Sequence, residues 1–274
     1  MKPMLLRLIL IAVALTGLNA DCSIAQPKRD KTIRAFKGLT LGAAAYVSGN
    51  IAREWAGPDR SLFSAPIGPD RFLRRVFHQP GKTTNWLDAN GVYYLIFGGL
   101  VTTAVAPIIQ SGRFDAFDLG YDVVAYSSGI LLTGGITRII KGMVSRPRPY
   151  AYFGTRPIPE DTSEAYRSFV SGHASIAFYM ATFLHYRLRT LLDSASSTQR
   201  TATDVLLFGL AIYTAYSRMQ IDQHYFTDVV AGALLGSAMA RLTHNWFYDG
   251  GPPSSSNVAH IRPGLRFIQI SIAF

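Results

Sequence analysis

An arginine, a histidine and an aspartate stand together directly before a small-residue, apolar segment. The stretch SRMQIDQHYFTD, residues 217–228, contains Arg218, His224 and Asp228, and VVAGALLGSAMA follows it. If the stretch enters a helix, His224 and Asp228 lie on one face, one turn apart. The carboxylate can then fix the imidazole tautomer and leave the other ring nitrogen free for nucleophilic attack. A surface histidine beside a helix-end carboxylate would give the same local pattern.

Two further stretches place polar groups at the ends of apolar segments. KGMVSRPRP has Lys141 at the end of one segment and Arg148 seven positions later, and SFVSGHAS has Ser171, Gly172 and His173 at the start of the next. The cations and guanidinium forks suit a tetrahedral oxyanion, and helix-start N–H groups add donors. His173 would protonate the leaving oxygen as general acid. Together with the first stretch, these residues predict metal-independent phosphoryl transfer.

Each motif also has a purely structural explanation. Basic residues at helix ends often anchor a protein at a membrane interface, His173 could cap its helix, and RPRP could simply end one. The phosphoryl-transfer interpretation depends on all three motifs falling at helix ends in an order that lets them converge. No His-Glu-x-x-His or paired-aspartate motif occurs, and the lone cysteine, Cys22, excludes a Cys-rich metal site. We therefore expect no metal and no other cofactor, and we expect vanadate to bind as a phosphate mimic.

The three motifs resemble those of the type-2 phosphatidic acid phosphatase superfamily, which includes the vanadium haloperoxidases. The family pattern is Lys-x6-Arg-Pro, then Pro-Ser-Gly-His, then Ser-Arg-x5-His-x3-Asp. Residues 141–228 match it except that Val170 stands in place of the proline of the second motif. The resemblance implies a helical bundle, a phosphohistidine intermediate on His224 and His173 as the acid, with Asp228 as the third catalytic residue. It also implies these phosphate ligands: Lys141, Arg148, Ser171, Gly172 and Arg218.

The segments that carry the motifs predict an all-α fold, a compact bundle of about six helices with the active site at the helix ends. The run GVYYLIFGGLVTTAVAPII, residues 91–109, is nineteen residues without a charge and is long enough to cross a bilayer. Residues 57–90 are turn-rich and polar. The other apolar segments that we expect to be helical are 119–142, 172–187, 203–217 and 226–242.

The domain organisation predicted from these patterns is one helical domain, residues 26–250, between two terminal segments. In residues 1–25, Lys2 and Arg7 precede the apolar run LILIAVALTGL, and small residues follow it. This pattern predicts an export signal or a first membrane helix. In residues 251–274, the end GLRFIQISIAF alternates with the period of a β-strand.

The composition of the chain limits the classes of molecule that it is expected to bind. Lysine and arginine number 27 against 17 acidic residues, a net charge of +10. This excess suits anionic lipid or a phosphorylated substrate, and the absence of a nucleic-acid-binding module argues against nucleic acid. We expect a phosphatase of a lipid phosphate or pyrophosphate such as phosphatidate, prenyl pyrophosphate or a lipid A type, in a bacterial membrane with the site facing the periplasm. The alternatives are a soluble periplasmic acid phosphatase, a vanadate-dependent haloperoxidase and a non-catalytic phosphate sensor.

Overall fold

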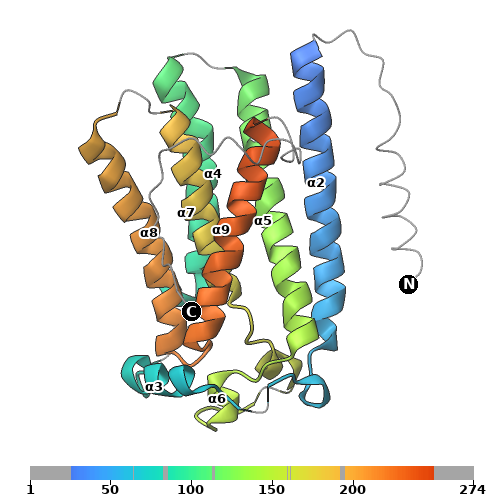
Figure 1. Cartoon of the computed structure of the whole chain (residues 1–274), viewed down its shortest axis with the longest axis vertical. Helices are drawn as coiled ribbons and strands as arrows, with labels where there is room; N and C mark the ends of the chain where they lie inside the picture. The colour runs from blue at the N-terminus through green and yellow to red at the C-terminus, as the bar shows by residue number, and fades with distance from the viewer. Residues whose placement is uncertain are drawn as a thin grey trace, which may run out of the picture.

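The long helices of the chain run side by side as an up-and-down bundle (Figure 1). The computed structural model describes residues 26–63, 65–82, 86–112, 115–158, 160, 162–191 and 195–249. Within these ranges the chain forms helices and no strand. The long helices are α2 (Gln26–Ala52), α4 (Trp86–Ser111), α5 (Ala116–Val144), α7 (Gly172–Leu191), α8 (Ser197–Gln220) and α9 (Phe226–Tyr248). The predicted all-α bundle of about six helices is confirmed.

Short helices cross the lower end of the bundle in Figure 1, where three interhelix connections meet. They are α3 (Gly68–Phe77), α6 (Pro149–Tyr152) and the 3-10 helices η1 (Arg53–Trp55), η2 (Pro58–Arg60) and η3 (Thr162–Tyr166). Residues 57–90, expected only to be turn-rich, therefore contain the helix α3. We call this end of the bundle, where the connections α2–α4, α5–α7 and α8–α9 lie, the motif end.

Local signals set the helix boundaries near the site. Asp115 caps α5 by accepting hydrogen bonds from the N–H groups of Phe117 and Asp118, at 2.8 and 3.2 Å. The helix ends at Val144, and the next residue, Ser145, adopts a left-handed conformation with φ 48° and donates its N–H to the Lys141 carbonyl. Lys141 consequently lies in the last turn of α5, at the motif end.

Each predicted apolar segment lies within one long helix, and two of the helices are candidates for crossing a membrane. By length and composition the candidate spans are Gly91–Ile108, in α4, and Ala116–Tyr152, which includes α5. The helix α2 was not among the predicted segments; it begins at Gln26 and includes the basic residues that follow. The predicted signal segment, residues 1–25, and the predicted strand in residues 251–274 lie outside the described residues.

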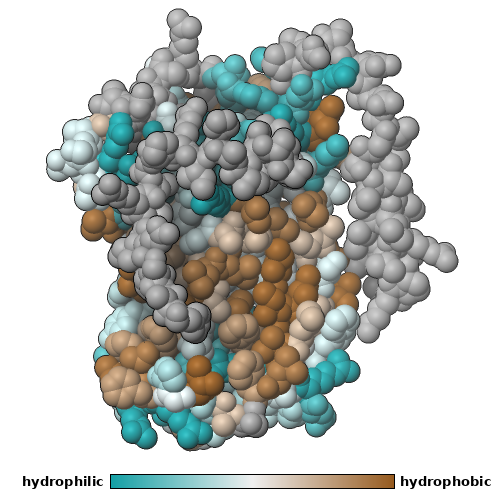
Figure 2. All heavy atoms as spheres, viewed as in Figure 1, coloured by the Kyte–Doolittle hydropathy of each residue, from teal (hydrophilic) through white to brown (hydrophobic). Residues whose placement is uncertain are grey.

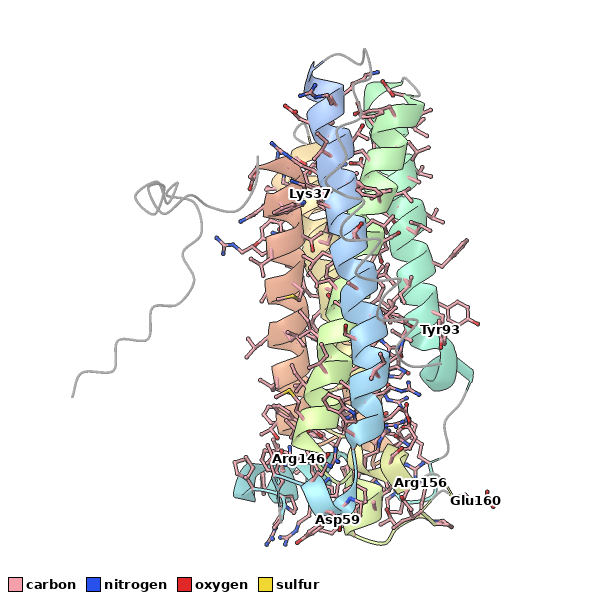
Figure 3. The ribbon with its side chains drawn as sticks, turned by 90° about the vertical axis from the view of Figure 1, so that its right-hand side faces the viewer. Lys37, Asp59, Tyr93, Arg146, Arg156 and Glu160 are labelled. Atoms are coloured by element: carbon pink, nitrogen blue, oxygen red, sulfur yellow. The ribbon has the colours of Figure 1, made fainter. Side chains whose placement is uncertain are left out.

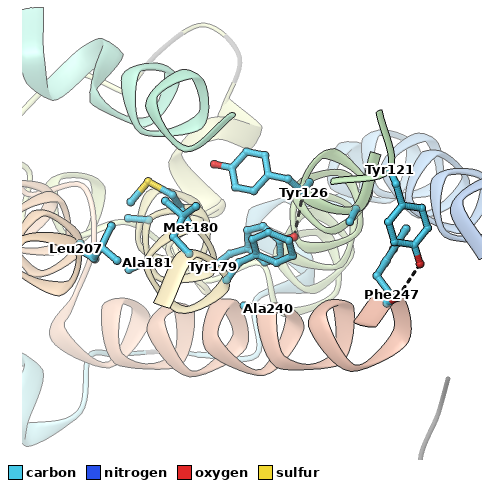
Figure 4. Packing of buried hydrophobic residues seen from close by; sticks show 13 residues of the cluster. Tyr121, Tyr126, Tyr179, Met180, Ala181, Leu207, Ala240 and Phe247 are labelled. Carbon is cyan, nitrogen blue, oxygen red and sulfur yellow. Dashed lines mark hydrogen bonds between the residues drawn. The ribbon is translucent and has the colours of Figure 1, made fainter. Parts of the chain in front are cut away.

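Aromatic and small residues pack the helices together. In the core shared by α5, α7 and α9, the Tyr179 hydroxyl donates to the Tyr126 carbonyl, and the Tyr121 hydroxyl donates to the Phe247 carbonyl (Figure 4). Glycines allow the close approach of α9 to α7, since a Cβ on Gly232 would lie 2.6 Å from the Ser171 carbonyl oxygen. The packing of α9 against α7 therefore fixes the start of α7, where the second motif begins.

Candidate active site

The three sequence motifs meet at the motif end of the bundle, as their places at helix ends predicted. The first motif runs from the last turn of α5 into α6, the second forms the start of α7, and the third runs from the end of α8 to the first turn of α9. Every predicted site residue lies in these segments: Lys141, Arg148, Ser171, Gly172, His173, Arg218, His224 and Asp228.

Direct contacts join the motifs to one another. The Ser171 N–H donates to the Asp228 carbonyl oxygen at 2.9 Å, which ties the start of α7 to the first turn of α9. A Cβ on Gly172 would lie 3.9 Å from Cε of Lys141, so the lysine side chain passes beside the start of α7. Three segments that are distant in sequence thus form one cluster, which local spacing alone could not establish.

The two cations of the first motif are held by groups of the α5–α7 connection and of the α8–α9 connection. Arg148 donates from Nε to the Glu164 carbonyl at 2.9 Å and from Nη2 to the Glu164 carboxylate at 3.0 Å, and its Nη1 donates to Gln223. Lys141 donates from Nζ to the Arg167 carbonyl oxygen. These contacts fix positively charged side chains beside the two histidines, where an oxyanion could bind them.

His224 lies in the connection before α9, which begins at Phe226, and its imidazole is buried. Nδ1 is 3.8 Å from Oδ2 of Asp228, longer than a hydrogen bond, and it makes no hydrogen bond to any residue that the structure describes. The expectation that both residues share one helical face is wrong, because His224 precedes the helix. The two side chains are nevertheless neighbours, and the orienting role of Asp228 stays a prediction.

Burial and surrounding cations lower the pKa of His224. Removal from water disfavours the imidazolium, and the charges of Lys141, Arg148 and Arg218, together with His173, disfavour it further, so the pKa lies well below the ordinary value of 6.5. Since the ring is neutral at neutral pH, one nitrogen keeps the lone pair that a nucleophile needs. The groups that lower this pKa come from all three motifs.

Sequence reasoning missed the residues that hold the Asp228 carboxylate. Arg146, at the lower end of α5 in Figure 3, donates to Oδ1 at 2.6 Å, while the Ser168 hydroxyl and the Tyr225 N–H donate to Oδ2 at 2.5 and 2.9 Å. Arg146 is itself paired with Asp70 of α3. The stretch KGMVSRPRP contains two arginines, and spacing selected only the second. No sequence motif around Asp70 indicates that this residue belongs to the site.

An apolar cavity of about 450 Å³ lies between α4, α7 and α8 and reaches the site. Its lining includes His173 and Ser217 of the second and third motifs, and most of the rest is apolar, with Leu95, Leu207 and Leu210 among its members. Among the described residues no group of three or more His, Cys, Asp or Glu side chains could hold a metal ion. The arrangement can therefore bind an anion beside two histidines and place an apolar group next to them.

Comparisons with known proteins identify a family and several similar chains. The family model of the PAP2 superfamily matches residues 122–251. The chain is similar to "Phospholipid phosphatase 2" of Rattus norvegicus, with 34% identity over 198 residues that cover 58% of this chain and 72% of the relative. It is also similar to "Probable lipid phosphate phosphatase 4" of Arabidopsis thaliana, with 28% identity over 54% of this chain and 55% of the relative.

The chain spans about half the length of the first curated relatives that it matches, 55%, 47% and 55% of them. Among solved structures it is similar to the "first transmembrane PAP2 type phosphatidylglycerolphosphate phosphatase from Bacillus subtilis", with 16% identity, a TM-score of 0.46, and coverage of 75% of this chain and 94% of that one. The match to the family model and the 34% identity to the rat relative show that the chain belongs to the PAP2 superfamily.

Proposed function

We propose that the protein is a membrane phosphatase that hydrolyses a lipid phosphate or pyrophosphate without a metal, through a phosphohistidine on His224. The observation that carries the proposal is the meeting of the cationic, two-histidine cluster with the apolar cavity of about 450 Å³ at His173. The cationic cluster can bind an oxyanion, and the apolar cavity can hold a hydrocarbon chain. The Arabidopsis thaliana and Rattus norvegicus relatives are named as a lipid phosphate phosphatase and a phospholipid phosphatase, which agrees with this substrate class.

In the first step Nε2 of His224 attacks phosphorus, and the bond from phosphorus to the leaving oxygen breaks as the P–N bond forms. In the free site, burial and the nearby cations lower the pKa of His173 and so disfavour a proton on its ring. The negative charge of the bound phosphate offsets those cations, so that His173 takes up a proton when the substrate binds. It gives this proton to the leaving oxygen, and the lipid departs as an alcohol, or as a phosphate when the substrate is a pyrophosphate. The positive charge that develops on His224 is offset by Asp228. The side chains of Lys141 and Arg148 bind the phosphoryl oxygens.

In the second step a water molecule attacks the phosphohistidine. His173, now neutral, accepts the water proton, the P–N bond breaks, and His224 is regenerated as inorganic phosphate leaves. Arg218 and the N–H groups at the start of α7 bind the phosphoryl oxygens through both steps, where fixed donors stabilise charge as it develops. The protein's own cations thus do the work that a metal ion performs in other phosphatases.

The outer surface of the bundle supports a membrane location. On the face shown in Figure 2, apolar residues form a middle band and hydrophilic residues gather toward both ends. Tyr93 of α4 points away from the bundle (Figure 3). The exposed large apolar side chains include Tyr93, Phe97, Val101 and Val105 of α4, Val205, Leu206 and Ile212 of α8, and Leu234 and Leu242 of α9. A bilayer would cover this surface, which is large for a water-soluble protein.

We further propose that the motif end faces the periplasm of a bacterial envelope. The short α7–α8 connection at the opposite end is flanked by Arg187, Arg189 and Arg200, and basic residues beside a short loop favour the cytoplasmic side for that loop. Single-cysteine variants Lys28→Cys and Asp59→Cys, made in a Cys22→Ser background, test this with a membrane-impermeant thiol reagent on intact cells. Labelling at position 59 alone is expected, and labelling at position 28 alone would reverse the orientation.

Phosphate release by the detergent-purified protein tests the activity. Long-chain phosphatidate and prenyl pyrophosphate should be hydrolysed faster than a water-soluble phosphate ester, with no loss in excess chelator and with inhibition by vanadate. Activity that a chelator removes and magnesium restores would overturn the mechanism. Halide oxidation by the vanadate-loaded protein, without phosphate release, would assign the haloperoxidase reaction instead.

A matched pair of glycine variants tests the lipid-binding role of the cavity. Gly98 of α4 lines the cavity and Gly209 of α8 does not, and a Cβ at either position would meet nothing within 4 Å. Gly98→Leu should raise KM for long-chain phosphatidate while leaving KM for the soluble ester unchanged, because the added side chain occupies the cavity. Gly209→Leu should change neither. Equal effects of the two variants on the lipid would refute the cavity as the lipid-chain site.

A further inference from the structure

A chain of three charged groups runs from α3 to the candidate active site. Arg146 donates from Nη1 to Oδ1 of Asp228 and from Nη2 to Oδ2 of Asp70, each at 2.6 Å. The side chains of Asp70, Arg146 and Asp228 are 0, 2 and 0% exposed. A buried carboxylate or guanidinium needs a partner of opposite charge, and here one guanidinium serves two carboxylates.

Thr227 closes this chain into a ring. Its N–H donates to Oδ1 of Asp70 at 3.0 Å, and its hydroxyl donates to Oδ2 at 2.8 Å and accepts from Arg146 Nη1 at 2.8 Å. Asp70 is therefore bonded to the residue directly before Asp228 as well as to the arginine that binds Asp228. The position of α3 is thus linked to the first turn of α9 through both backbone and side chain.

Two aromatic rings fix the plane of the guanidinium. The Arg146 carbon Cζ lies 4.7 Å from the Phe63 ring centroid and 4.3 Å from that of Tyr225, the residue next to His224. A guanidinium held between rings and bonded to two carboxylates has little freedom to turn. Any change in its position must move Asp228.

The net charge of the buried group formed by Asp70, Arg146 and Asp228 explains why it contains two carboxylates. Arg146 and Asp228 alone would form a neutral pair, which could do little to stabilise a positive His224. Asp70 brings the net charge of the buried group to −1. The second carboxylate therefore lets the group retain a negative charge toward the imidazole, although a guanidinium is bonded to the carboxylate nearest to it.

We propose that Asp70 and Arg146 are positioning residues that act on His224 through Asp228, holding its carboxylate in place and leaving it with net negative charge. This inference rests on the proposed function, in which His224 is the nucleophile. It gives α3 a part in the reaction, although α3 contains no residue of the three motifs. Asp70 and Arg146 touch no reacting atom, and both work by fixing the residue that orients one.

Asp70→Asn keeps the shape of the side chain and removes its charge. We expect kcat to fall about tenfold and KM to change less than about twofold, because an indirect partner of a catalytic group is removed and the phosphate ligands are not. In an Asp228→Asn background the same substitution should cost less than about twofold more, since the residue through which it acts is already altered. A further tenfold loss in that background would make the role merely structural and overturn the inference.

A matched control is available at the opposite end of the bundle. Asp122 is also a buried aspartate, bonded to the guanidinium of Arg187 at 2.5 Å and to the Tyr248 hydroxyl at 2.7 Å. Asp122→Asn should leave kcat unchanged, whatever it does to the melting temperature. If it lowers kcat as much as Asp70→Asn does, the effect is one of stability and the inference fails. Melting temperatures of both variants show how far each is folded.

A measurement that does not need turnover separates this inference from the proposed function. Nitrogen NMR of histidine-labelled protein at neutral pH, with the His224 signal assigned by a His224→Gln variant, reports which ring nitrogen carries the proton. We expect the proton on Nδ1 in the wild type and a shift toward Nε2 in Asp70→Asn. An unchanged tautomer in folded Asp70→Asn would overturn the inference, whereas a wild type without phosphatase activity would refute only the proposed function.

Discussion

Replacing Gly232 of α9 by alanine should separate the two halves of the candidate active site by a small, calculable distance. The added Cβ would lie 2.6 Å from the Ser171 carbonyl oxygen and 3.2 Å from the Ala174 Cβ. Ordinary carbon–oxygen contact begins at about 3.3 Å, so α7 and α9 must part by roughly 0.7 Å at this point. Ser171 belongs to the second motif and precedes His173 by two residues, and the Ser171 N–H is bonded to the Asp228 carbonyl in the first turn of α9.

The loss of activity follows from that displacement. A misplacement of 1 Å can cost about 100-fold in rate, so roughly 0.7 Å corresponds to a fall in kcat of about 20-fold. The stability cost is smaller, because overpacking at about 1–3 kcal/mol is partly offset by the helix preference of alanine over glycine, about 1 kcal/mol. Gly232→Ala should therefore remain folded and lose activity.

The assay is phosphate release from phosphatidate by the purified protein, with the melting temperature measured in parallel. Gly209→Ala on α8 is the control, because its Cβ would meet nothing within 4 Å. The control should keep its activity and gain up to about 1 kcal/mol in stability. A Gly232→Ala variant with wild-type kcat would refute the reasoning that this contact sets the distance between the second and third motifs.

The remaining predictions concern the two residues at the centre of the third motif. His224→Ala should lower kcat by several orders of magnitude, and a variant that keeps more than about a tenth of the activity would exclude a phosphohistidine. Asp228→Asn should cost less, because an amide still contacts the ring but cannot offset its positive charge; wild-type kinetics would remove Asp228 from the mechanism. The lowered pKa of His224 should make the free energy of unfolding fall as pH drops below about 6.5, where the unfolded chain takes up a proton that the folded chain binds only at lower pH. His224→Gln should weaken this dependence in urea titrations at several pH values, and an unchanged slope would contradict the cause given for it.

The long helices and the place of the motifs could be predicted because both depend on local sequence. The uncharged residues 91–109 had to be buried in lipid or protein, and polar groups such as Lys141 and His173 fall where apolar segments stop. The helix α3 was missed because it is only ten residues long and lies within a polar, turn-rich stretch. Short helices of this kind depend on tertiary contacts for their stability.

The inner arrangement of the site could not be predicted, because it depends on contacts between distant residues. Arg146 and Arg148 stand two positions apart in the same motif, yet the first binds buried carboxylates and the second binds Glu164 and Gln223. The separation of His224 from Asp228 was also beyond local reasoning, since a four-residue spacing has a defined geometry only inside a helix, and α9 begins after the histidine.

The ring of Asp70, Arg146, Thr227 and Asp228 also constrains the order in which the chain can assemble. Asp70 and Thr227 are 157 residues apart in the sequence. During synthesis α3 therefore leaves the ribosome long before Thr227, which donates hydrogen bonds to Asp70, has been made. Closing so long a loop is slow compared with forming the helices themselves. The docking of α9 should therefore be a late event that closes the motif end. Until then α3 should remain open to proteases, and phosphatase activity should appear only when that protection does.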